Sequence, residues 1–234
     1  DKNHENNHVS EAFFKSCRAI SQENRAQFVF SGERTIANTI WNPESPHWNF
    51  CRSLPLQQLD RESTVKLISE PLNNLQISFL NREKFEESIW NYTSGHPQLA
   101  QYLGDKIVKM VNSRNPLDRE NISFNDVNAI VNSFEFMEHY LTTYWGQATE
   151  FEKLISILFV SGVRTPAKLI DSIQEVENNN TEEKVTAALK LLDLYGIIEQ
   201  SGESYKLRAS WFDESLKAYS NDIQEMIKRY KDRV

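Results

Sequence analysis

The stretch IWNYTSGHPQLAQYLGDKIV, residues 89–108, contains the break that decides how the helices of this chain are connected. Gly95 can end one helix because glycine readily adopts a left-handed backbone, and Pro97 can open the next because its fixed φ suits a first turn. Either residue alone would interrupt a helix, and the chain has only seven Gly and seven Pro. Their use together around His96 indicates a defined turn between helices at 82–94 and 97–113.

Helical patterns continue on both sides of this turn. Asp60 is a candidate N-cap for the segment RESTVKLISEPL, and Asn115 to Asn121 is a linker. Ser123, with Asp126 three residues later, begins a long helix in the manner of a capping box. We expect that helix to reach about Tyr144, which completes a four-helix region.

After Gly146 the pattern predicts three helices followed by a hairpin. The helices fall at 151–160, 166–176 and 181–195, and strands at 197–200 and 204–208 enclose a tight turn. One face of the third helix is apolar at helical spacing, with Val185, Ala188, Leu189, Leu192 and Tyr195. This order is that of a winged helix, and a final amphipathic helix is predicted at 212–234.

The first part of the chain has a different character. A helix is predicted at 10–20 with Ser10 as its N-cap, and a short aromatic strand at 28–34, FVFSGER. A short apolar run bounded by turn residues is typical of a buried parallel strand. Residues 42–55 contain three prolines and predict a loop.

Composition limits the function classes. The 234 residues carry 33 acidic and 26 basic side chains, a net charge of -7, which argues against broad phosphate-driven binding of nucleic acid. The only cysteines, Cys17 and Cys51, suggest buried thiols in a reducing cytosol. The sequence has no signal-peptide pattern and no apolar run long enough for a bilayer, so we expect a cytoplasmic location without membrane contact. Because the chain begins with Asp1, we expect a fragment of a longer protein.

One motif near the start suggests a metal site. HENNH, residues 4–8, matches the H-E-x-x-H pattern of zinc peptidases, in which His4 and His8 bind zinc and Glu5 is the base. Its flanks are poor helix formers, and the sequence has no convincing third ligand. We therefore expect a solvated loop, with a zinc peptidase as a remote alternative.

Strong catalytic signatures are absent from the sequence. It has no G-x-x-x-x-G-K-[ST] phosphate loop, no G-x-S-x-G elbow and no C-x-x-C pair. The carboxylate pairs Glu86-Glu87 and Glu182-Glu183 are expected on solvated helix faces. We therefore name no catalytic residue in this chain.

Three segments, read in order, resemble the C-terminal part of AAA+ and STAND nucleotide-dependent ATPases. AQFVFSGER resembles the core strand that carries the sensor-1 position, and CRSLPLQQLDRESTVKLISEPL resembles the exit from that core into the helical lid. YTSGHPQLAQYLGDKI is similar to the lid segment that bears the G-x-P motif, and a winged helix follows the lid in the same family. The likeness covers nearly the whole chain and is greatest to STAND-type ATPases of signalling and defence.

The resemblance implies roles for five residues. Gly95 and Pro97 would form the G-x-P turn, with Pro97 near the adenine of a bound ATP or ADP and His96 as the variable middle residue. Arg34, or alternatively Ser31, would hold the sensor-1 role near the terminal phosphate, which suits the donor fork of an arginine.

The parts that hold phosphates and Mg would lie upstream of Asp1. ATP hydrolysis is therefore expected only when such a part is present, not from this chain by itself. The implied partners are that nucleotide-binding part or an attached effector domain, another protein, or further copies of the chain in a homo-oligomer.

A DNA-binding winged-helix protein of replication or transcription is the alternative. The third helix would be the recognition helix, but its charged residues give a net charge of -1 and it begins with Glu182 and Glu183. The basic tail KRYKDRV, residues 228–234, is more typical of a solvated helix end. DNA binding is therefore not the favoured function.

The predicted fold is mostly α with an α/β remnant. The end of a P-loop ATPase core is expected at 1–56, a helical lid at 57–146, a winged helix at 147–211 and a C-terminal helix at 212–234. As a function, we expect a nucleotide-dependent switch whose lid and winged helix clamp the nucleotide and control an attached effector.

Overall fold

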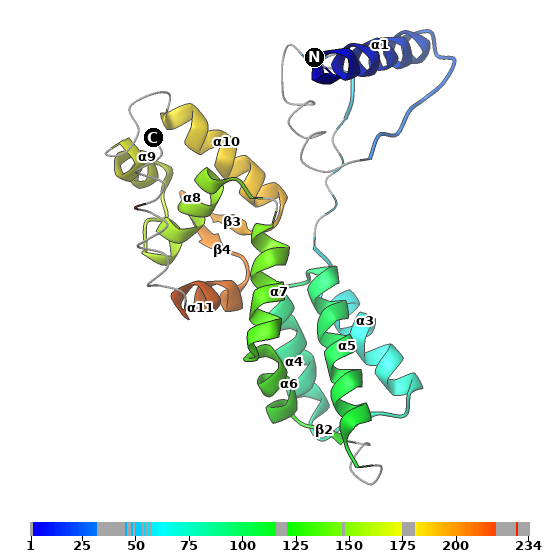
Figure 1. Cartoon of the computed structure of the whole chain (residues 1–234), viewed down its shortest axis with the longest axis vertical. Coiled ribbons are helices and arrows are strands. Elements are labelled where there is room, and N and C mark those ends of the chain that lie inside the picture. Colours follow the sequence, from blue (N-terminus) through cyan, green and yellow to red (C-terminus); the bar gives the residue numbers. More distant parts are fainter. Residues whose placement is uncertain are drawn as a thin grey trace. The chain divides into compact units, whose positions relative to one another are not determined.

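The structure is a computed structural model that describes residues 2–31, 45, 48, 50–52, 54, 56, 58–115, 121–146, 148–174, 181–218 and 228. Within these ranges the side chains of residues 2–11, 210, 217 and 218 are not described. The chain divides into two compact units, Asp1–Leu56 and Gln57–Val234. The described residues are mostly helical (Figure 1).

The first unit contains helix α1, Lys2–Gln22, which begins well before the predicted start at Ser10. The expectation of a loop at residues 4–8 was therefore wrong. Asn and His cost a helix only a few tenths of a kcal/mol each relative to Ala, so a nucleated helix can extend through them.

The aromatic segment after α1 is extended, but the predicted strand is not formed in its described part. Residues 26–31 belong to no strand, and residues 32–34 lie outside the described ranges. A strand needs a neighbour to accept its backbone hydrogen bonds, and the described residues of this unit include no other strand. Phe30 instead contacts the rings of Phe14, Phe28 and Phe50.

The second unit begins with helices that the caps predicted well. Asp60 caps α3, Arg61–Asn74, by accepting a hydrogen bond of 2.7 Å from the Ser63 N–H. Helices α4, Arg82–Thr93, and α5, Pro97–Ser113, meet at the predicted break. Two short strands, β1, Ser78–Phe79, and β2, Asn121–Ile122, pair in parallel at one end of these helices.

The long helix predicted from Ser123 is in fact two helices. The capping box of Ser123 and Asp126 is confirmed and opens α6, Phe124–Val131, but a second helix, α7, Phe134–Trp145, starts after Ser133. The Ser133 hydroxyl accepts the Phe136 N–H at 3.2 Å and caps α7. The hydroxyl also donates to the Ile130 carbonyl, so this side chain competes with the continuous helix. The described part of the predicted four-helix region therefore contains five helices.

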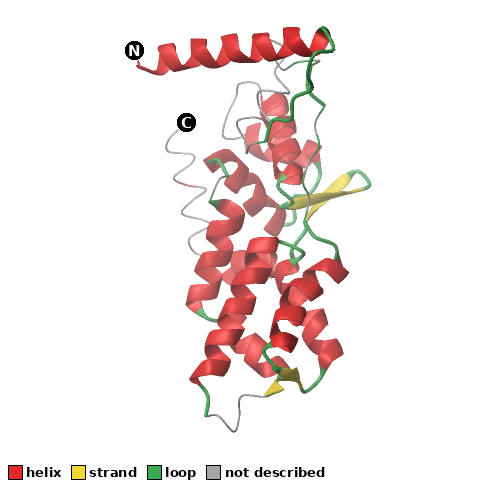
Figure 2. Cartoon of the chain, turned by 90° about the vertical axis from the view of Figure 1, so that its right-hand side faces the viewer, coloured by secondary structure: helices red, strands yellow, loops and turns green. Residues whose placement is uncertain are grey.

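The last part of the unit has the predicted order of elements. Helices α8, Glu150–Val160, α9, Pro166–Gln174, and α10, Thr181–Leu194, precede a hairpin of β3, Ile198–Ser201, and β4, Ser204–Leu207. The strands are antiparallel, with Ile198 opposite Leu207, and Gly202 turns between them at φ 64°. Figure 2 shows this hairpin as the larger of the two small sheets. Helix α11, Ser210–Ala218, follows, and the remainder of the predicted C-terminal helix lies outside the described ranges.

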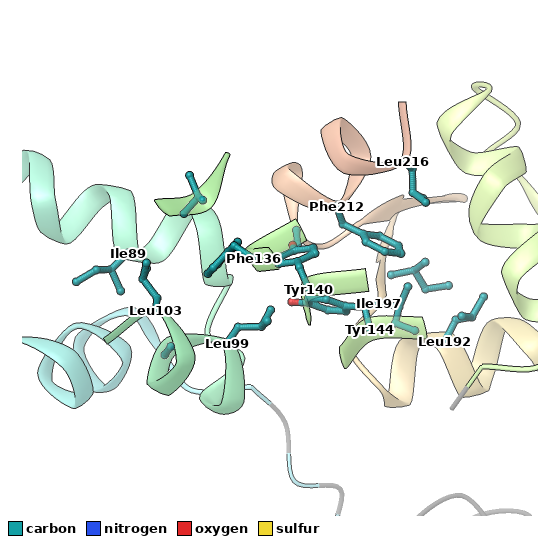
Figure 3. Close-up of a cluster of buried hydrophobic side chains, with 14 of the residues drawn as sticks. Ile89, Leu99, Leu103, Phe136, Tyr140, Tyr144, Leu192, Ile197, Phe212 and Leu216 are labelled. Carbon is teal, nitrogen blue, oxygen red and sulfur yellow. The ribbon is translucent and has the colours of Figure 1, made fainter. Parts of the chain in front are cut away.

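A single apolar core runs through the second unit. Ile89, Leu99 and Leu103 of α4 and α5 belong to the same buried cluster as Leu192 of α10 and Phe212 of α11 (Figure 3). Aromatic side chains of α7 connect the two ends of the cluster. Tyr140 and Tyr144 lie with ring centroids 6.2 and 5.3 Å from that of Phe212. The helices 61–145 and the hairpin region are thus packed on one core.

Candidate functional site

The turn between α4 and α5 reverses the chain with two successive left-handed residues. Ser94 has φ 46° and Gly95 has φ 81°. The Ser94 N–H donates to the Trp90 carbonyl at 2.8 Å, and the His96 N–H donates to the Thr93 carbonyl at 2.9 Å. The turn therefore satisfies the last carbonyl groups of α4 and ends that helix sharply.

Gly95 is required for space as well as for conformation. Its carbonyl accepts a hydrogen bond of 2.9 Å from the Leu59 N–H, which brings the two backbones close together. A Cβ atom at Gly95 would overlap with the carbonyl oxygen of Leu59. This contact ties the turn to the extended residues that lead into α3.

Pro97 and His96 open α5. Pro97 occupies the first turn of the helix and is exposed, while His96 is the N-cap without a side-chain cap hydrogen bond. The His96 ring turns inward, with its centroid 5.2 Å from the ring of Tyr144 on α7. The turn thus presents a proline to solvent and an imidazole to the core.

The environment of His96 disfavours its protonated form. Its Nδ1 atom is buried and has no hydrogen-bond partner among the described residues. Burial lowers the pKa of His96, and the nearby His139 lowers it further. We therefore infer that His96 is neutral at pH 7.

Gln58, the residue before Leu59, contacts the hairpin region. The Gln58 side chain donates from Nε2 to the Tyr195 carbonyl at 3.0 Å and accepts at Oε1 from Arg208 Nη1 at 3.4 Å. Gly196, with φ 66°, lies directly against this amide, where a Cβ atom would overlap with it. Leu59 is therefore bonded to the Gly95 turn, and Gln58, the residue before it, is bonded to the end of α10 and to the residue that follows β4.

The other predicted nucleotide-binding residues are in the first unit. Ser31 is exposed at the end of the extended aromatic segment, and Arg34 lies outside the described ranges. The structure groups Gly95, His96 and Pro97 in one turn, and the sensor-1 role of Ser31 or Arg34 stays a prediction.

The HENNH motif falls within α1, so His4 and His8 are four residues apart in one helix. Their side chains and that of Glu5 are outside those described. Among the residues that are described, no group of three or more His, Cys, Asp or Glu side chains could hold a metal ion.

The third helix of the hairpin region exposes few cations. On α10 the charged positions Glu182, Glu183, Lys184, Lys190 and Asp193 are all exposed. On the hairpin, Lys206 forms an ion pair with Glu199 at 2.7 Å. Arg208 lies 4.0 Å from both Glu199 and Asp193. The basic side chains of the hairpin are thus already near carboxylates.

A second candidate site, which sequence reasoning missed, is a pocket of about 560 Å³ between α4, α6 and α11. We call it the α4–α6–α11 pocket. Three half-buried aromatic side chains line it, Tyr92, Phe124 and Trp211. Its described lining also includes Ser88, Asn91, Asn128, Asn132 and Glu214.

Part of this pocket had a signal in the sequence. Asn128 and Asn132, the C-cap of α6, are four residues apart and therefore lie on the same face, which indicates a polar patch there. Trp211 and Glu214 come from a distant segment, so only the packing of α11 against α4 reveals that they meet Tyr92.

The fold and these sites define a protein whose described residues are mostly helical and include a β-hairpin flanked by helices. No described helix combines the length and apolarity that a membrane crossing requires. Comparisons with models of protein families, with curated proteins and with solved structures found no match to this chain.

Proposed function

We propose that this chain is the C-terminal portion of a nucleotide-dependent switch of the STAND/AAA+ kind. In this proposal residues 57–146 act as a helical lid, and the three helices and hairpin at 147–211 act as a winged helix. The lid and winged helix clamp an adenine nucleotide and hold an attached effector or partner inactive until the clamp opens.

The observation that carries the proposal is the double attachment of residues 58–60. Leu59 is hydrogen-bonded to the Gly95 carbonyl, and Gln58 is hydrogen-bonded to the carbonyl of Tyr195. A shift of the turn would therefore pull on Leu59, whose neighbour Gln58 contacts the end of α10 and the residue that follows β4. This is the physical link that a switch needs between a ligand-sensing turn and the module that responds.

Pro97 is suited to the adenine side of such a site. Its ring is exposed, its φ is fixed, and it lies at the start of a helix whose turn is held by Gly95. A rigid apolar ring can pack against the flat face of a base without losing conformational entropy. Phosphates and Mg would be held by an upstream part of the protein, with Arg34 or Ser31 near the terminal phosphate.

The test is the affinity of the full-length protein for ADP and ATP. Replacing Pro97 with Ala should weaken binding about fivefold to tenfold, because the packing surface is lost while the helix remains. Pro166→Ala is the matched control, since Pro166 also occupies a helix first turn, that of α9. Isothermal titration of the two variants and the unmodified protein measures the difference.

An equal ADP affinity for the Pro97→Ala variant and the unmodified protein would refute the role of this residue. A full-length protein that binds neither ADP nor ATP would refute the switch. A loss of affinity in the Pro166→Ala variant equal to that in Pro97→Ala would show a general effect on helix stability instead.

The second candidate is a DNA-binding winged-helix protein, which the order of helices and hairpin favours. The exposed face of α10 has more acidic than basic side chains, and the hairpin cations already lie near Glu199 and Asp193. Proteins that bind DNA neutralise several phosphates with free Lys and Arg. A gel-shift assay on mixed duplexes at physiological salt would support this candidate if it showed a retarded complex.

A zinc peptidase based on His4, Glu5 and His8 is the remote alternative. It requires about one zinc ion per chain, which elemental analysis of the purified protein would detect. A chain without stoichiometric zinc would remove it.

A further inference from the structure

The α4–α6–α11 pocket has an aromatic floor and a polar rim. The rings of Tyr92 and Trp211 are nearly perpendicular, at 85°, with centroids 5.2 Å apart. The amide of Asn132 and the carboxylate of Glu214 lie at the exposed edge. This combination of ring faces and hydrogen-bonding groups is typical of sites for small polar molecules, and the volume falls in the usual range for such sites.

The amides of the pocket are oriented by bonds to one another. Asn128 Oδ1 accepts from the Tyr92 hydroxyl at 3.1 Å and from Asn132 Nδ2 at 3.0 Å. The Asn128 side chain is therefore turned so that its NH₂ group remains to donate, and the Asn132 side chain so that its oxygen remains to accept. A ligand here would meet both a donor and an acceptor in fixed positions.

Trp211 adds a donor that lacks a partner. Its Nε1 atom is buried and has no hydrogen-bond partner among the described residues. A buried N–H without an acceptor is costly, and in native structures such groups are rare. Because Trp211 lines the pocket, a small rotation of its side chain on ligand binding would let this N–H donate to a ligand oxygen or ring nitrogen.

The charge of the pocket disfavours anions. Of the described residues that line it, Glu214 is the only charged one, and neither Lys nor Arg is among them. The Lys84 ammonium lies 4.3 Å from the centroid of the Phe124 ring and is not among the described lining residues. Burial raises the pKa of Tyr92, and the negative charge of Glu214 raises it further. A neutral ligand fits these surroundings better than a phosphate does.

We propose that the α4–α6–α11 pocket binds a neutral ring compound with neighbouring hydroxyl groups, the chemistry shared by nucleosides and free sugars. The ligand ring stacks on Tyr92 or Trp211, and Glu214 accepts hydrogen bonds from two adjacent hydroxyls. The Trp211 N–H and the Asn128 amide donate to ligand oxygen or nitrogen atoms. This site is separate from the Gly95 turn and does not depend on the proposed switch.

The experiment titrates the chain with adenosine in one arm and D-glucose in the other, followed by tryptophan fluorescence and calorimetry. Saturable binding is expected in at least one arm, and the arm that responds identifies the source of the ligand. Glu214→Gln should weaken binding about tenfold, because it removes a charged acceptor. Trp211→Phe keeps an aromatic ring but removes the N–H donor, so it should also weaken binding.

Two controls separate this site from others. Glu183→Gln changes an exposed carboxylate on α10 and should leave affinity unchanged. Pro97→Ala should also leave it unchanged, which distinguishes the pocket from the proposed nucleotide site. Because Glu214 is exposed, Glu214→Gln should fold normally. The test therefore remains valid even if Trp211→Phe fails to fold.

Three results would overturn the proposal. The first is the absence of binding in both arms up to about 10 mM, which would place the Kd of any site above that concentration. The second is binding that neither Glu214→Gln nor Trp211→Phe reduces. The third is binding that Pro97→Ala abolishes, which would locate the ligand at the turn.

Discussion

His96 illustrates what a single residue adds to a helix break. Its neighbours Gly95 and Pro97 account for the turn, but they do not explain why a histidine lies between them. In the structure the ring lies against Tyr144, while the His96 carbonyl accepts the Ala100 N–H at 3.0 Å. The side chain therefore connects the start of α5 to α7, a role that depends on a residue far away in the sequence.

The first prediction concerns the pH dependence of stability. Burial and His139 lower the pKa of folded His96 below its unfolded value of 6.5, so the unfolded chain binds this proton more readily. His96 therefore does not reduce the free energy of unfolding above pH 6.5. Below that pH, protonation of His96 in the unfolded chain lowers the free energy of unfolding. His96→Asn should lessen the loss of unfolding free energy between pH 7.5 and 5.5, measured by urea titration at both pH values. An unchanged pH dependence would contradict this assignment.

At the scale of elements, local side-chain chemistry predicted most helix ends correctly. Asp60, the Ser123–Asp126 pair and Pro97 act through hydrogen bonds or backbone limits within a few residues, so their effects can be read from the sequence. The break at Ser133 was missed because the apolar pattern continues across it. Only the structure shows that the Ser133 hydroxyl donates to the Ile130 carbonyl and accepts from the Phe136 N–H, and so caps α7.

The turn between α4 and α5 allows a test with a matched pair of glycines. Gly95 and Gly162 have similar φ values, 81° and 91°, but only Gly95 lies against another backbone, that of Leu59. Gly162→Ala should cost about 1 kcal/mol of unfolding free energy for the left-handed conformation alone. Gly95→Ala should cost at least about 2 kcal/mol, because the turn must also move away from Leu59.

Urea denaturation of the two variants measures this difference. Equal losses would mean that the contact between Gly95 and Leu59 is not tight. Amide exchange at Leu59 gives an independent readout, since its N–H donates to Gly95 and should exchange faster only in the Gly95→Ala variant.

At the scale of the whole second unit, α7 joins the two ends of one core. Phe212 of α11 is fully buried and contacts Tyr140, Tyr144 and Trp145 of α7. A packed core transmits the loss of a large side chain to all the elements that share it. The helices at 61–145 and the hairpin are therefore expected to unfold together.

Phe212→Ala tests this expectation. The change should cost about 3–5 kcal/mol, because it leaves a large cavity among aromatic rings. Phe134→Ala is the control: Phe134 is 72% exposed, and its loss should cost less than about 0.5 kcal/mol. Hydrogen exchange should show α5 and β3 losing protection to the same extent in the Phe212 variant. A loss of protection confined to the hairpin would show that the hairpin unfolds independently of the helices at 61–145.

The sequence by itself determined the helical class, the turn at Gly95 and the order of three helices and a hairpin. These features follow from caps, glycine and proline backbone limits, and the spacing of apolar residues, all of which act over a few positions. The tertiary structure alone decided that Leu59 and Gln58 join the turn to the end of α10, and that Trp211 meets Tyr92 beside three asparagines. Such contacts join residues that are distant in the chain, and they arise only when the shared apolar core brings those segments together.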